Sequence, residues 1–556
     1  MSDLPKTSGA SDVADVNAKG ADDAVFFGHP RGLAYIVFTE AWERFSFYGM
    51  QALLILYMAT YLFLSENSGN VAAFEPFRSL FEAVFGPLSI QALASQVFGA
   101  YVGLVYFAPV LGGLIGDRLL GRTKAVLAGA LFMAVGHFLM AFEASFLLAL
   151  AALILGSGLL KGNLAAQVGG LYKKSDQRRD SGYSIYVFSI NVGAFIAPLI
   201  CGTLGEVYGW HYGFGLAGIF MFFGMLQFYF AQKIFGRIGL SPKGTKDFDD
   251  AVENKLEATK EAVEDVADDA KKSKVTRDRL IVIGIFAFFT IFFWWAFEQA
   301  GGSMTIFAAD YTDRVLVDNG AMIFKVFNTL LTIIPMLIIT WVLVMLFKQT
   351  FGKYALSNIF LGISFAIIWA IVLWMLYREF TAEAAEVPAS WFGILNSFFI
   401  IAFAPLFSKI WQSKYNPSGP VKFAIGLILL GLGFGILAFG SMGIPLGAKT
   451  ASVSMIFLIL AYLFHTLGEL CVSPVGLSYV SKLAPLKLVG LMFGVWFVAN
   501  FIANLAAGIT GSYIDPIVEE YGMTTFFLIF TLIPVAAGII LVILNKTMIR
   551  MMHGIK

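Results

Sequence analysis

Charged residues are scarce in this chain. Asp, Glu, Lys and Arg make up 13% of its 556 residues, whereas hydrophobic residues make up 58%. The mean hydropathy is +0.78. Soluble domains carry about 25% charged residues, so this composition excludes a soluble globular protein and indicates an all-α polytopic membrane protein. The net charge of +1 gives no information about nucleic acid, and we expect no nucleic-acid partner.

Cysteine and histidine are also few. The two cysteines, Cys201 and Cys471, lie in apolar segments, and the five histidines are scattered along the chain. Neither residue type shows the spacing of a metal site or of a disulfide framework. We therefore expect no metal and no other cofactor, and we expect a protein that is not an enzyme.

Long apolar stretches dominate the rest of the sequence. Fourteen of them reach about 20 residues, the length that crosses the hydrocarbon core of a bilayer as a helix. Lys and Arg gather in alternate connecting loops, and this pattern places both termini in the cytoplasm. A polar segment of mixed charge separates the first six spans from the last eight. Two six-helix halves joined by a long cytosolic loop are the layout of the major facilitator fold.

The predicted domain organisation follows from these spans. It comprises a disordered cytosolic tail (1–32), an N-terminal six-helix bundle (33–235), a cytosolic amphipathic linker (236–278), a C-terminal bundle (279–546) and a second cytosolic tail (547–556). The C-terminal bundle includes an extra pair of spans over 320–379, without a charge at mid-membrane depth. We expect this pair to form a lateral two-helix hairpin outside the twelve spans of the major facilitator layout.

The loop after the second span supports this fold. The segment Gly113–Lys124 holds an Asp-Arg pair and further basic residues, and it resembles the signature that major facilitators carry between their second and third helices. Glycine allows these helices to approach closely. The aspartate, Asp117, can receive a helix N-terminus or an arginine of the neighbouring bundle.

Three charges interrupt the first span. Glu40, Glu43 and Arg44 have the helical spacing i, i+3 and i+4, so they project from one face. Each charge costs about 2.5–3.5 kcal/mol inside a membrane helix, and the trio together costs about 8–10 kcal/mol. Two interpretations stay open: a self-neutralised pair facing the bundle, or an ion or substrate site in a water-filled cavity.

Five motifs, in order, resemble those of the proton-coupled oligopeptide transporter family. The first is the charged trio with the Tyr-Gly pair that follows it. The others resemble the family's motifs of helices 4, 5, 7 and 10 and are Gly158–Asn163, Ile190–Pro198, Phe297–Ser303 and Gly468–Ser478. The resemblance implies a symporter that imports di- and tripeptides with protons in a bacterial inner membrane, and we expect a monomer. Open alternatives are a family carrier of nitrate or an amino-acid conjugate, a proton-coupled drug antiporter and a non-transporting nutrient sensor.

Buried charges in opposite halves suit a zwitterionic substrate. The resemblance implies that Arg44 and Lys161 hold the carboxylate of a peptide, and that Glu469 holds its ammonium group. Lys161 should also meet a glutamate of the charged trio, because an unpaired ammonium is costly in a membrane. A purely structural ion pair is the alternative for Lys161, and pairing with His465 is the alternative for Glu469.

Glu298, in the seventh span, is expected nearer the outer leaflet than the other charges. The resemblance assigns proton coupling to this residue together with Glu40 and Glu43. The family often places an arginine partner for this acid where the present chain has Gln51. We therefore expect either a hydrogen bond between Gln51 and Glu298 or a protonated Glu298.

Aromatic and amide side chains at the family's motif positions are expected to line the substrate pocket, because pocket walls must accept varied peptide side chains. For each of them, packing against lipid or within the core is the alternative. The candidates are Tyr48, Tyr106, Asn191, Trp294, Asn396 and Trp496.

Overall fold

A computed structural model describes residues 26–172, 176–236, 238–240, 274–414, 416–485 and 488–555. Within these residues, fourteen helices are long and apolar enough to cross a membrane, which confirms the predicted number of spans. The predicted tail 1–32 and the predicted linker 236–278 lie largely outside the described residues. The predicted domain boundaries therefore stay predictions.

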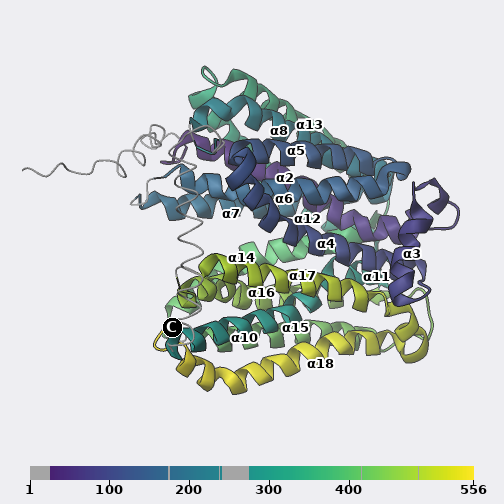
Figure 1. The fold of residues 1–556 in the computed structure, drawn as a ribbon. Coiled ribbons are helices and arrows are strands. Elements are labelled where there is room, and N and C mark those ends of the chain that lie inside the picture. Colours follow the sequence, from purple (N-terminus) through teal and green to yellow (C-terminus); the bar gives the residue numbers. More distant parts are fainter. Residues whose placement is uncertain are drawn as a thin grey trace, which may run out of the picture.

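Six membrane-crossing helices form an N-terminal bundle, which lies above the C-terminal bundle in Figure 1. A short amphipathic helix, α3 (Phe74–Phe85), follows the first of them. π-Helical turns extend three of the helices, and those after α7 begin at Pro198, which has no N–H to continue the α-helical ladder. The bounds are α2 (Arg31–Tyr57), α4 (Ile90–Ile115), α5 (Arg122–Met140), α6 (Phe146–Gly170), α7 (Arg178–Ala197) and α8 (Trp210–Ala231), with turns η1 (Met58–Leu62), η3 (Gly116–Leu120), η5 (Pro198–Gly202) and η6 (Leu204–Tyr208).

The remaining helices form the C-terminal bundle and the extra hairpin. Two pairs of very short strands join the loops between them: β1 (Thr312–Asp313) runs parallel to β4 (Val453–Ser454), and β2 (Val315–Leu316) runs antiparallel to β3 (Ala385–Glu386). The helices are α10 (Lys274–Phe297), η8 (Glu298–Ala300), α11 (Ser303–Asp310), α12 (Asp318–Thr350), α13 (Ala355–Thr381), η9 (Ala389–Gly393), α14 (Ile394–Gln412), α15 (Gly419–Gly440), α16 (Ile456–Leu483), α17 (Val489–Gly511) and α18 (Ile514–Met551).

The hairpin of α12 and α13 lies beside the N-terminal bundle, although its sequence follows α10 and α11. Figure 1 shows α13 next to α8. The Tyr35 hydroxyl of α2 donates a hydrogen bond to Asn358 Oδ1 of α13 at 3.0 Å, and Ser357 Oγ donates to the Gln227 carbonyl of α8 at 2.7 Å. These four side chains are buried. The hairpin is thus fixed to the bundle by satisfied polar contacts in an apolar setting.

Hydrogen bonds between the bundles gather at one end of the molecule. We call this the far end, because it carries α3 and lies opposite the described C-terminus in Figure 1, which marks the near end. There, Gln96 Nε2 donates to Ser512 Oγ at 3.2 Å, and Trp391 Nε1 donates to Thr203 Oγ1 at 2.8 Å. The Glu206 carboxylate accepts the backbone N–H groups of residues 389 and 390 at 2.8 and 2.9 Å.

Glycine allows the closest approach between the bundles at this end. A Cβ on Gly99 of α4 would lie 2.6 Å from the Cα of Gly508 on α17, and any side chain would therefore push the two helices apart. Small residues permit this kind of backbone contact in membrane proteins. The far end is consequently closed by backbone packing as well as by hydrogen bonds.

Candidate functional site

A cavity of about 310 Å³ lies between the two bundles. Helices α2, α4 and α7 form its wall on the N-terminal side, and α10, α14 and α16 form its wall on the C-terminal side. Seven of the residues predicted for the site line it, together with others that the sequence analysis did not assign. Its polar and aromatic lining comprises Tyr48, Gln51, Tyr106, Asn191, Trp294, Phe297, Glu298, Thr305, Ser390, Asn396, Ser397, Tyr462, His465 and Glu469.

The charged trio of α2 forms one buried ion cluster of two carboxylates and one guanidinium. Arg44 Nε lies 3.0 Å from Glu40 Oε1 and also contacts Glu43 Oε2. The Tyr186 hydroxyl of α7 donates to Glu40 Oε2 at 2.7 Å. All three charged residues are at most 7% exposed and do not line the cavity. A close ion pair with an added hydrogen bond offsets the cost of burying these charges.

Lys161 does not make the predicted ion pair in this structure. Among the described residues, no carboxylate lies within 4.0 Å of its Nζ atom. The ammonium lies instead over two aromatic rings, 4.2 Å from the centroid of Phe47 and 5.3 Å from that of Tyr106. Cation–π attraction therefore replaces the expected carboxylate partner. Because Tyr106 lines the cavity, Lys161 lies one aromatic ring away from it.

Glu469 faces the cavity from α16. Asn396 of α14 donates from Nδ2 to Glu469 Oε2 at 2.8 Å, and the same amide lies 3.2 Å from Thr466 Oγ1. The alternative pairing with His465 is not formed among the described residues: that imidazole packs on the Phe434 ring, with 4.4 Å between centroids. One predicted pocket residue thus orients the predicted ammonium ligand.

Glu298 begins the turn η8 at the far end of α10 and lines the cavity beside Gln51. The hydrogen bond expected between these two side chains is not present among the described residues. Trp496 does not reach the cavity. Its ring packs where a side chain on Gly476 would stand, which fixes α17 against α16.

Two functional candidates were not predicted from the sequence. Tyr186 binds Glu40, and Tyr462 lines the cavity while its hydroxyl donates to the Ala300 carbonyl at 3.1 Å. Tyr462 precedes Glu469 by seven residues, so helical periodicity could have placed both on one face. Tyr186 had no such signal, because only the packing of α7 on α2 brings it to the carboxylate.

The architecture and the site agree with one known family. A family model described as the POT family matches residues 123–248 and 369–527, about half of the chain. The chain belongs to the POT family. This confirms the resemblance that the sequence motifs indicate.

POT-family relatives match over nearly the whole length. An uncharacterized transporter of Bacillus subtilis is 33% identical and covers 95% of this chain and 96% of its own. A di-/tripeptide transporter of Lactococcus lactis subsp. cremoris is 30% identical over 96% of this chain and 99% of its own. The crystal structure of a mutant peptide transporter POT in complex with alafosfalin superposes with a TM-score of 0.70 at 27% identity, covering 98% of this chain and 100% of that one.

Proposed function

We propose that this POT-family protein is a proton-coupled symporter that imports di- and tripeptides by alternating access. The observation that carries the proposal is the cavity between the bundles, with carboxylates on one wall and cations directly behind the other. A short peptide presents an ammonium and a carboxylate at its two ends, so it fits a site whose walls differ in charge. The name of the Lactococcus relative supports the same substrate class.

The predicted residues that line the cavity or lie directly behind its wall have roles in this proposal. Glu469, oriented by Asn396, holds the ammonium group of the peptide through charge-assisted hydrogen bonds. Arg44 and Lys161 attract the peptide carboxylate through the aromatic wall and bind it once that wall moves. The side chains that accommodate the peptide are Tyr48, Tyr106, Asn191 and Trp294.

Protons act through the carboxylates. Arg44 is held by Glu40 and Glu43, so protonation of either acid weakens one of its contacts and frees the guanidinium for the peptide. Glu298 lies on the cavity wall, where it can take a proton during the same cycle. This linkage makes peptide binding and proton binding mutually favourable.

The direction of transport follows from the loop charges. If the basic loops are cytosolic, both termini and the near end face the cytoplasm of a bacterial cell, and the closed far end faces outward. The state described here would then be inward-facing. Each monomer contains both bundles and the cavity between them, so a single chain suffices for transport.

Carboxylates on the cavity wall disfavour the alternatives. A nitrate carrier needs cationic side chains in contact with its substrate, whereas the acids that line this cavity, Glu298 and Glu469, would repel an anion. A drug antiporter would favour a more apolar cavity than one lined by amides, tyrosines and acids.

Uptake by the purified protein in liposomes tests the proposal. With an inward proton gradient, labelled dialanine should accumulate inside above its external concentration, and a protonophore should abolish the accumulation. Unlabelled tripeptide should compete, whereas nitrate should not. Uptake that never exceeds equilibration, or that a protonophore leaves unchanged, would contradict proton coupling.

A further inference from the structure

A second cavity, of about 270 Å³, lies between the hairpin and the N-terminal bundle. We call it the hairpin groove. Helices α2 and α7 form its inner wall, and α12 and α13 form its outer wall. Its lining side chains are apolar except for two groups: the Ser189 hydroxyl, which already donates to the Tyr186 carbonyl at 2.7 Å, and the indole N–H of Trp42, which has no hydrogen-bond partner among the described residues. The groove therefore offers a ligand no charge and a single N–H donor at most.

The hairpin groove lies at the depth of the hydrocarbon core. On α7 it runs from Ile185 to Ile196, about 16 Å along the helix axis, and it begins about two turns inside the end of the helix. It opens to the outer surface between α7 and α12, where Phe188 and Ile338 are 56% and 52% exposed. The medium at that opening is lipid chains, because the surrounding helices span the membrane.

An empty groove of this size would be unfavourable. Packed interiors contain few voids larger than a water molecule, because the lining atoms of a void lose their dispersion contacts. A buried water needs about two to four polar partners, and the single free N–H of Trp42 does not supply them. A flexible hydrocarbon chain supplies the missing contacts without a desolvation cost.

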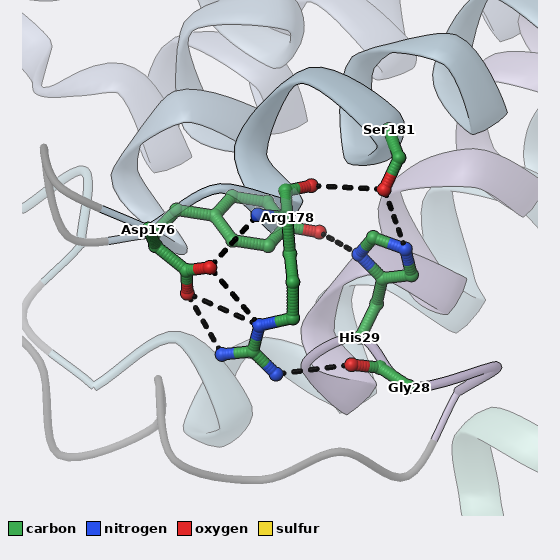
Figure 2. Close-up of polar contacts among 6 residues, drawn as sticks. Gly28, His29, Asp176, Arg178 and Ser181 are labelled. Carbon is green, nitrogen blue, oxygen red and sulfur yellow. Dashed lines mark hydrogen bonds and ion pairs between the residues drawn. The ribbon is translucent and has the colours of Figure 1, made fainter.

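Aromatic residues close the near end of the groove. Phe26 and Phe27, just before α2, line it, and the Phe27 ring lies 5.9 Å from that of Trp341 on α12. Polar contacts hold the neighbouring residues (Figure 2), and Arg178 Nη1 donates to the Gly28 carbonyl at 3.0 Å. His29 Nδ1 lies 2.8 Å from the Tyr172 hydroxyl.

Both ring nitrogens of His29 have hydroxyl partners. Ser181 Oγ lies 3.1 Å from His29 Nε2, and Asp176 pairs with Arg178 at 2.8 Å. Burial and the Arg178 charge lower the pKa of His29, whereas Asp176 opposes that shift. These contacts hold Phe26 and Phe27 at the near end of the groove. A hydrocarbon chain therefore enters the groove through the opening between α7 and α12.

We propose that the hairpin groove holds one acyl chain of a membrane phospholipid. The acyl chain fills the space between α12 and the inner wall. It thereby completes the packing between the hairpin and the N-terminal bundle. Its inner contacts are Phe38, Trp42 and Phe45, on the α2 helix that also carries the charged trio. The site recognises the chain and not the headgroup, and it is separate from the cavity between the bundles.

Photocrosslinking in vesicles tests this site. The full-length protein is reconstituted in phosphatidylethanolamine and phosphatidylglycerol with a small fraction of phosphatidylcholine that carries a diazirine in one acyl chain. After irradiation, mass spectrometry should find adducts on Trp42 and Phe45, which are only 5% and 1% exposed and which a lipid outside the groove cannot reach. Adducts confined to outward-facing side chains would overturn the proposal.

Variants in which a larger side chain fills the groove provide a second test by crosslinking. In Ile339→Trp the larger side chain occupies the groove, so the adducts on α2 should be lost; Val342→Phe should act in the same way. Leu337→Trp is the matched control, because Leu337 lies on the same helix, is 55% exposed and does not line the groove; its adducts should stay. Unchanged adducts in the filled variants, or displacement of the wild-type adducts by dialanine, would overturn the proposal.

Stability gives a readout that does not depend on crosslinking. Adding phospholipid to the detergent-purified protein should raise the melting temperature of the wild type and of Leu337→Trp more than that of Ile339→Trp. An equal rise in all three would show that lipid acts only at the general surface. The positions of the adducts on the wild type test the proposal even if a variant with a filled groove does not fold.

Discussion

The two sides of the cavity between the bundles differ in how their charged groups are paired. On the N-terminal side, Arg44 is held by two carboxylates, and one of these also receives a tyrosine hydroxyl. On the C-terminal side, Glu298 and Glu469 line the cavity, and no cationic side chain among the described residues lies within 4.0 Å of either. The guanidinium behind the N-terminal wall is thus already paired without substrate, whereas the acids of the C-terminal wall lack a cation.

This difference assigns distinct tasks to the two walls. A complete ion cluster resists change until a proton or an anion competes for one of its members. An acid without a counter-ion gains most from an incoming ammonium group or proton. We therefore expect substitutions in the N-terminal cluster to affect both stability and transport, and substitutions of the C-terminal acids to affect transport selectively.

Removing Arg44 should have the largest effect. Arg44→Ala leaves two buried carboxylates without their cation, and breaking a buried pair in this way costs about 3–5 kcal/mol. Arg44→Lys restores the charge without the planar guanidinium, so it should regain stability but not dipeptide uptake. Thermal unfolding and liposome uptake, measured on both variants, separate the two effects. Near-normal uptake by Arg44→Lys would contradict the role of the guanidinium.

Glu469→Gln should reduce uptake selectively. The glutamine can still accept the hydrogen bond from Asn396, so stability should change little. The lost charge-assisted contact to the ammonium group is worth about 1.5–3 kcal/mol, which corresponds to roughly a tenfold to hundredfold loss of peptide affinity. Competition against labelled dialanine measures this loss. A variant that loses stability as severely as Arg44→Ala would show that Glu469 is structural.

Glu298→Gln should separate transport from coupling. The amide imitates a permanently protonated acid, so proton-driven accumulation should be lost while exchange of labelled for unlabelled peptide across the vesicle continues. Gln299→Glu is unsuitable as a control, because Gln299 is buried and donates to the Ala507 carbonyl. Glu383→Gln, in the loop after α13, is the matched control and should behave as wild type. Full accumulation by Glu298→Gln would place coupling in the α2 cluster alone.

Asn358→Ala should have the smallest effect. Asn358 lies in neither wall, and its loss removes two buried hydrogen bonds, one from the Tyr35 hydroxyl and one to Thr350 Oγ1. We expect a destabilisation of about 1–3 kcal/mol, because the remaining partners are buried, with little change in uptake. Thermal unfolding and initial uptake rates check this. A loss of uptake at unchanged stability would show that the hairpin takes part in the transport cycle.

Much of the architecture could be predicted from the sequence, because apolar runs and loop charges are local signals. The fourteen spans follow from run length, and the buried acids Glu298 and Glu469 follow from their cost in a membrane. The contacts between spans could not be predicted. Lys161 lies over aromatic rings and Trp496 packs on Gly476 because of helix packing, which leaves no periodic trace in the sequence.

The hairpin illustrates the same limit. Its two spans are evident from hydropathy, but its place beside α8 depends on the buried contacts of Tyr35 and Gln227 with residues more than 100 positions away. Sequence separation of this size conceals which bundle a span joins. The hairpin groove, which that placement creates, was therefore not foreseeable.

The central claim is that the C-terminal wall receives the peptide ammonium group through Glu469. A double-mutant cycle tests it most directly: binding of dialanine and of its analogue without the amino group is measured on the wild type and on Glu469→Gln. We predict that the wild type prefers dialanine by about tenfold or more, since an ion-paired hydrogen bond is lost with the amine, and that the variant binds both ligands equally. An undiminished preference in Glu469→Gln would contradict the account.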